Sequence, residues 1–112
     1  ELSITDQTQI GVVEDGSVTS RRVDPQPLGL ACPSLDPLRA TDVEDAARMI
    51  RDIVDGRPGP PTDMTLLSAG AALHIAGAAA SLDSGVELAR ASINSGRAAQ
   101  ALADLSRLSA EH

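Results

Sequence analysis

The stretch from Gly56 to Ala103, GRPGPPTDMTLLSAGAALHIAGAAASLDSGVELARASINSGRAAQALA, decides how this chain folds, because it joins a proline-broken turn to a long run of helix-forming small residues. Thirteen alanines lie between Ala69 and Ala103, and Gly70 and Gly77 are seven residues apart. Small side chains let a helix backbone approach its neighbour closely. We therefore expect this stretch to pack tightly against a partner surface.

A first helix is expected immediately before this stretch. Thr41 and Glu44 have the spacing of a capping box, in which the side chain of each satisfies a free backbone N–H of the first turn. Apolar residues then recur at helical spacing, and the helix is expected to end at Gly56. The apolar positions of this helix are Val43, Ala47, Ile50 and Val54.

Three more helices are expected beyond Gly56. Prolines 58, 60 and 61 prevent the first helix from continuing, and a second helix begins at Pro61 or Thr62 and runs to about Ala79. Ser81 is expected to cap a third helix, and Gly96 fits the position just after its end. The apolar positions are Leu82, Val86, Ala89 and Ile93 in the third helix and Ala98, Ala101, Leu105 and Leu108 in the fourth.

Residues 1–24 are expected to contain a β-hairpin. Residues 8–13 and 17–23 flank Asp15-Gly16, a dipeptide typical of the type I′ turn. The turn fixes the register, which pairs Glu14 with Ser17, Val13 with Val18 and Val12 with Thr19.

This register divides the apolar residues of the hairpin between two faces. Ile10, Val12 and Val23 share one face, which is expected to be core, while Val13 and Val18 share the other, which is expected to be half-covered. Two strands are marginally stable alone, so the hairpin is expected to belong to a larger sheet.

The sequence therefore predicts an α/β fragment forming part of one domain over residues 1–112. Its parts are a hairpin region at 1–24, a loop at 25–40 with one helical turn at 34–38, and about four helices at 41–112. The chain opens with Glu1 rather than Met, which suggests a piece of a longer polypeptide. It has no Phe, Tyr or Trp, so its core is expected to be thin.

The charge and apolar patterns argue against two classes of partner. The net charge is −7 and the basic residues are scattered, whereas nucleic-acid binding needs a concentrated basic surface. Residues 64–80 are uncharged but rich in alanine and glycine, which favours a buried helix over a membrane span. With no signal-peptide pattern at residues 1–13, we expect a cytoplasmic protein.

The side chains that could perform chemistry are few. Cys32 is the only cysteine and is expected to be structural. His74 is expected to be a packed or singly hydrogen-bonded imidazole, and His112 a terminal side chain. Ser68 lies within a helix, where packing is a better explanation than phosphate binding. The acidic residues Asp42, Glu44 and Asp45 fall in the first turn of a helix, where the helix dipole favours negative charge.

A series of short motifs follows one order along the whole chain. It comprises Glu1-Leu2-Ser3, Pro25 to Leu30 with an additional Pro27, Glu44-Asp45-Ala46, Gly56, Gly59, Pro60, Asp63, Leu66, Leu67, Ser81-Leu82, Gly85-Val86, Ser95-Gly96 and Ala98. This series resembles the carboxy-terminal part of the anthranilate phosphoribosyltransferase family. Asp45 and Ser68 stand where that family is expected to have asparagines, so hydrogen bonds at helix ends are expected to differ.

The resemblance implies an activity for a complete enzyme. Such an enzyme transfers phosphoribose from phosphoribosyl pyrophosphate to anthranilate in tryptophan biosynthesis, uses magnesium (Mg²⁺) and forms a homodimer. In that family an acidic pair binds the metal, and Glu1 resembles the second acid, so Glu1 is the one metal ligand implied for this chain. An exposed terminal carboxylate with no role is an equally weighted alternative for Glu1.

The resemblance places the phosphoribosyl pyrophosphate loop and the anthranilate-binding residues upstream of Glu1. We therefore expect this segment to be inactive alone and to need the missing amino-terminal portion or a complementary chain. The alternatives are a non-catalytic α-rich interaction module and a split-gene subunit on the same scaffold. A related nucleic-acid-binding branch is a third possibility, which the negative charge disfavours.

Overall fold

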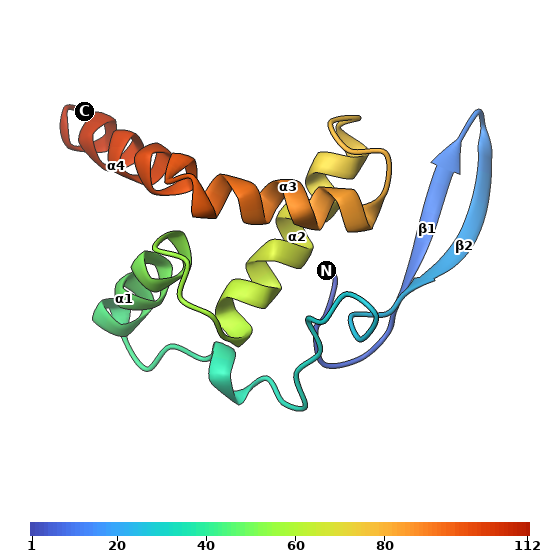
Figure 1. The fold of residues 1–112 in the computed structure, drawn as a ribbon, viewed down its shortest axis with the longest axis horizontal. Helices are drawn as coiled ribbons and strands as arrows, with labels where there is room; N and C mark the ends of the chain where they lie inside the picture. The colour runs from blue at the N-terminus through green and yellow to red at the C-terminus, as the bar shows by residue number, and fades with distance from the viewer.

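The computed structural model describes residues 1–112 as a β-hairpin followed by helices (Figure 1). The hairpin projects away from the helices, and α2 and α3 cross near the centre of the molecule. This agrees with the predicted α/β fragment. The elements are β1 (Thr8–Glu14), β2 (Ser17–Val23), the 3₁₀ turn η1 (Asp36–Leu38), α1 (Val43–Val54), α2 (Pro60–Ile75), α3 (Leu82–Asn94) and α4 (Arg97–Ala110).

The hairpin has the predicted turn and register. Asp15 and Gly16 both have positive φ, 49° and 77°, as the tight turn requires. Glu14 pairs with Ser17, Val13 with Val18 and Val12 with Thr19.

The hairpin is less buried than predicted on both faces, because the expected core face is half-buried and the expected half-covered face is exposed. Ile10, Val12 and Val23 are only half-buried. On the other face Val13 is 71% exposed and Val18 72% exposed. The sheet contains only these two strands, so nothing in this chain covers either face fully.

The start of α1 differs from the predicted capping box by one residue. Asp42, not Thr41, is the N-cap, and its side chain accepts a hydrogen bond from the Asp45 backbone N–H at 2.8 Å. The Asp45 carboxylate in turn accepts from the Thr41 N–H at 2.9 Å. Glu44 takes no part in this pair of contacts. The helix ends as expected, with Gly56 just beyond its C-cap.

The end of α2 is earlier than predicted, at Ile75 rather than near Ala79. Gly77 has φ of +79°, a left-handed conformation that closes the helix. Its N–H donates to the His74 carbonyl at 3.0 Å, and the Ala78 N–H donates to the Leu73 carbonyl at 2.9 Å. Gly77 is therefore a helix stop and not a point of close helix contact.

The close contact involves Gly70 and Gly85, where α2 crosses α3. A Cβ atom built on Gly85 would lie 2.2 Å from the Gly70 carbonyl oxygen. A Cβ on Gly70 would lie 2.7 Å from the Val86 backbone nitrogen. Glycine at both positions is thus required for this crossing. The expected close approach of the small-residue helices is confirmed here, with Ser81 as the predicted cap of α3 and Gly96 just beyond its end.

The core lies between the amino-terminal segment, the 25–40 loop and the α2–α3 pair. Cys32 belongs to it, as the predicted structural role requires, and its backbone N–H donates to the Ile4 carbonyl at 2.8 Å. Neither α1 nor α4 has a buried residue. Val43 in α1 is 85% exposed and Leu105 in α4 is 62% exposed, so their apolar faces are uncovered. The core members are Ile4, Leu30, Cys32, Leu66, Leu67, Val86 and Ala89.

None of the helices combines the length and apolar character needed to cross a membrane.

Candidate functional site

The amino-terminal segment, which carries Glu1, is held against the core. Ile4 is fully buried, and Leu2 packs against the core cluster. The Ser3 backbone N–H donates to the Thr8 hydroxyl at 3.0 Å, which ties the segment to the first strand. Glu1 itself is exposed. The carboxylate of Glu1 is therefore exposed to solvent, beside a segment that Leu2 and Ile4 anchor to the core.

This chain does not gather a cluster of three metal-ligating side chains. No three His, Cys, Asp or Glu side chains lie close enough together to hold a metal ion. Magnesium is commonly bound through one or two carboxylates, with phosphate oxygens and waters as the other ligands. The solvent-facing carboxylate of Glu1 fits that chemistry as one ligand, with the other ligands supplied from outside these residues.

A small polar hollow close to this segment has a structural explanation. It is lined by residues 4–7, residues 24–26 and Ala31. The Gln7 backbone N–H donates to Asp6 at 2.7 Å, and the Gln7 side-chain amide donates to Asp24 at 3.0 Å. Asp24 thus joins the segment to the end of the hairpin, while the Asp6 carboxylate makes a local contact with its neighbour in the sequence.

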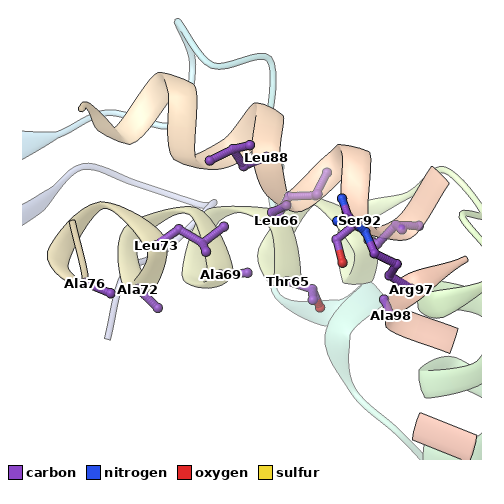
Figure 2. Close-up of a pocket in the computed structure, with 12 residues that line it drawn as sticks. Thr65, Leu66, Ala69, Ala72, Leu73, Ala76, Leu88, Ser92, Arg97 and Ala98 are labelled. Atoms are coloured by element: carbon purple, nitrogen blue, oxygen red, sulfur yellow. The ribbon is translucent and has the colours of Figure 1, made fainter. Parts of the chain in front are cut away.

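An open apolar groove lies beside the α2–α3 crossing, and we call it the α2–α3 groove (Figure 2). Its volume is about 740 Å³. Ala76 lies toward one end and Arg97, at the start of α4, toward the other. The lining residues are Thr65, Leu66, Ala69, Ala72, Leu73, Ala76, Leu88, Ala89, Ser92, Ile93, Arg97 and Ala98.

Asp63, in the first turn of α2, is a half-buried carboxylate. Burial raises the pKa of this carboxyl above its ordinary value, and the positive charge of Arg90 on α3 opposes that rise more weakly. Arg90 forms its ion pair with Glu87, at 3.8 Å, and none with Asp63. The sequence marks Asp63 only as part of a motif, because its burial depends on the helix crossing.

The other candidate side chains lie apart from Glu1 in the sequence and have local roles. Nδ1 of His74 lies 3.0 Å from the Ala79 carbonyl oxygen, so this nitrogen donates the proton of a single hydrogen bond, as expected. Ser68 is exposed in the middle of α2, and the expectation that it alters a helix end is wrong. Asp45 does lie at a helix end, where its carboxylate accepts a hydrogen bond from the Thr41 backbone. His112 is exposed at the chain terminus.

Comparison with known proteins decides the family. Residues 1–99 match the model of the glycosyl transferase family, a/b domain. The chain belongs to this family. The match spans the hairpin, the loop and the helices up to the start of α4, which confirms the resemblance drawn from the ordered motifs.

Individual relatives of this glycosyl transferase segment carry a more specific name. It is 43% identical over 105 residues to an anthranilate phosphoribosyltransferase of Thioalkalivibrio sulfidiphilus, covering 94% of this chain and 31% of the relative. A protein of the same name from Azorhizobium caulinodans is 40% identical, with 96% and 31% covered. One from Polynucleobacter necessarius is 36% identical, with 91% and 30% covered. The chain thus spans about a third of the length of these curated relatives.

Proposed function

We propose that this chain is the carboxy-terminal segment of an enzyme that transfers phosphoribose from phosphoribosyl pyrophosphate to anthranilate in tryptophan biosynthesis. The observation that carries the proposal is the sequence identity of 36 to 43%, over more than nine-tenths of the chain, to proteins named anthranilate phosphoribosyltransferase. A cytoplasmic homodimer is part of the same proposal. Light scattering and cell fractionation of the complete polypeptide test those two points.

The reaction forms a bond between the anthranilate nitrogen and the anomeric carbon of ribose, and it breaks the bond from that carbon to pyrophosphate. Positive charge builds on the ribose and negative charge on the departing pyrophosphate, so catalysis depends on placing opposite charges near both. Bound magnesium supplies charge neutralisation for the pyrophosphate. Glu1 would hold the metal as one carboxylate ligand, and the anchoring of Ile4 and Leu2 limits how far Glu1 can move.

The remaining residues of this chain have a supporting role in the proposed enzyme. Glu1, His74 and Asp63 do not form a cluster of catalytic side chains, since His74 serves the turn after α2 and Asp63 lies in the first turn of that helix. The segment alone is therefore expected to be inactive.

The direct test compares the 112-residue chain with the complete polypeptide that its gene encodes. Formation of phosphoribosyl anthranilate is measured by mass spectrometry with anthranilate, phosphoribosyl pyrophosphate and Mg²⁺. We expect turnover by the complete polypeptide and none by the 112-residue chain. Turnover by the short chain would contradict the expected inactivity, and its absence from the folded complete polypeptide would overturn the proposed function.

The role of Glu1 is tested by Glu1→Gln in the complete polypeptide. Removing one ligand charge should raise the Mg²⁺ concentration needed for half-maximal rate by about tenfold or more, since supporting and ligand groups at metal sites commonly contribute factors of 10 to 100. Glu14→Gln is the matched control, because Glu14 is also exposed and forms no ion pair. Equal Mg²⁺ dependence in the two variants would show that Glu1 is not a ligand.

A further inference from the structure

The α2–α3 groove has an apolar floor of small residues and a single charged residue, Arg97, at one end. We propose that it receives an apolar helix from the remaining part of the same polypeptide, and that this helix carries a carboxylate that pairs with Arg97. The proposal rests on the family membership of the chain and not on the reaction that the complete enzyme catalyses.

The shape of the floor favours a helix as the occupant. Ala69 and Ala72 on α2 and its C-cap residue Ala76 recur at helical spacing and present only methyl groups to the groove. Such a surface lets the backbone of a second helix come close. Leu73 and Leu88 also line the groove (Figure 2). Leu88 is 43% exposed, so a docked helix would remove apolar surface from water.

Arg97 indicates that the occupant carries a negative charge. It is the first residue of α4, where the free N–H groups of the helix favour anions and disfavour a cation. No acidic residue lies in that first turn, and Arg97 forms no ion pair. Its only side-chain hydrogen bond runs from Nε to the Ser95 hydroxyl at 3.2 Å. A carboxylate supplied from elsewhere would offset the unfavourable placement of this exposed arginine against the helix dipole.

Five other arginines form ion pairs with acidic residues of the chain. They are Arg39, Arg48, Arg57, Arg90 and Arg107. Arg97 is the one arginine of the groove lining. Arg21, Arg22 and Arg51 form no ion pair either, so what distinguishes Arg97 is its place in the groove lining at the start of α4.

The remaining part of the same polypeptide is the best-supported source of the helix. The curated relatives are about three times as long as this chain. All lining residues, from Thr65 to Ala98, fall inside the family match. A second copy fits poorly, because two facing grooves would leave a void between them and the lining contains no carboxylate to pair with a partner's arginine.

The test follows Arg97→Glu by thermal unfolding in two settings, the 112-residue chain and the complete polypeptide. In the short chain a glutamate at the first position of α4 complements the helix dipole, so Tm should stay the same or rise. In the complete polypeptide the same change places two carboxylates together, and Tm should fall by about 2 °C or more. A change of the same sign in both settings would overturn the pairing.

A second pair of variants tests the groove itself. Ala72→Arg fills the floor, and Ala91→Arg is the matched control because Ala91 is an exposed helical alanine outside the groove. We expect Ala72→Arg to lower Tm in the complete polypeptide but not in the short chain, and Ala91→Arg to have little effect in either. Equal effects of the two variants would overturn the groove as a docking site. So would sedimentation data showing that Ala72→Arg dissociates a dimer of the short chain, since the occupant would then be a second copy.

Discussion

At the scale of single residues, the contact between Gly70 and Gly85 fixes how closely the two central helices pack. An added methyl group on Gly85 would meet the Gly70 carbonyl oxygen at 2.2 Å, and backbone atoms cannot move aside as a flexible side chain could. Overpacking of this kind costs about 1 to 3 kcal/mol or more. The gain in helix propensity from glycine to alanine is about 1 kcal/mol, so the steric cost is the larger effect.

Gly85→Ala is therefore expected to lower the free energy of unfolding, as measured by chemical denaturation. Ser68→Ala is the matched control, because Ser68 is exposed on α2 and the substitution gains helix propensity without a clash. The control should be neutral or slightly stabilising. A Gly85→Ala variant as stable as the control would show that the two helices can separate at no cost.

Asp45 gives the molecule a pH-dependent helix cap. The hydrogen bond from the Thr41 backbone, followed by that from the Arg48 side chain, lowers the pKa of Asp45 below its ordinary value of 3.8. A carboxyl whose pKa is lower in the folded state adds stability above the unfolded pKa, and this stability is lost as pH falls through the folded pKa. The contribution should therefore be complete at neutral pH and disappear below pH 3.8.

Asp45→Asn should accordingly lower Tm at pH 7, and the difference from the unsubstituted chain should shrink as the pH falls below about 3.8. Thermal unfolding followed by circular dichroism between pH 7 and pH 2.5 measures this convergence. Glu14→Gln serves as the control, since Glu14 is exposed on the hairpin and forms no ion pair. A constant gap between the Asp45 variant and the unsubstituted chain at all pH values would contradict the assignment.

At the scale of elements, the hairpin and the α2–α3 pair differ in how well they are supported. The hairpin is held by its own ladder and has no buried residue, whereas α2 contributes Leu66 and Leu67 to the core. Local opening requires little free energy where few apolar contacts must break. Backbone amides of Val12 and Thr19, which face each other in the ladder, should therefore exchange hydrogen with solvent much faster than those of Leu67 and Gly70.

Hydrogen exchange followed by NMR on the 112-residue chain tests this order, and the amides of α2 serve as the internal reference. Comparable protection in β1 and α2 would mean that the hairpin is supported by contacts that its exposure does not reveal. In the complete polypeptide, added protection of the hairpin would support the predicted larger sheet.

Local signals in the sequence were sufficient for several element boundaries. The Asp15-Gly16 dipeptide predicted both the hairpin and its register, and Ser81 and Gly96 marked the limits of α3. The end of α2 was mispredicted because the alanines after Gly77 favour helix and gave no sign of a stop. The cap of α1 was mispredicted by one residue because neighbouring Thr41 and Asp42 both suit that position. The Asp45 backbone N–H donates to the Asp42 side chain, and the Asp45 carboxylate accepts from the Thr41 N–H.

At the scale of the whole molecule, this chain is more open than an independent domain of its length. Its radius of gyration is 15.4 Å, against about 13 Å expected for a compact domain of this size. Only 12 of 112 residues are buried, which accounts for the exposed apolar faces of α1 and α4. The openness agrees with a segment that spans about a third of its relatives.

The candidate site was only partly predictable at this scale. Glu1 was singled out through motif resemblance, since an isolated carboxylate has no local pattern that announces a metal ligand. The α2–α3 groove could not be predicted, because helical spacing shows which residues share a face but not which face remains uncovered. That depends on the angle at which α2 crosses α3, and hence on Gly70 and Gly85 together.

The two outer edges of the hairpin determine how this chain behaves when it is made by itself. Each strand has only one neighbour, so the outer edge of each presents unpaired backbone N–H and C=O groups. Charged side chains discourage strand addition, and β2 carries Arg21 and Arg22 while β1 carries only Glu14. Aggregation through edge pairing would therefore begin at β1, and a lysine introduced at Gln9 is the simplest change to keep concentrated samples in solution.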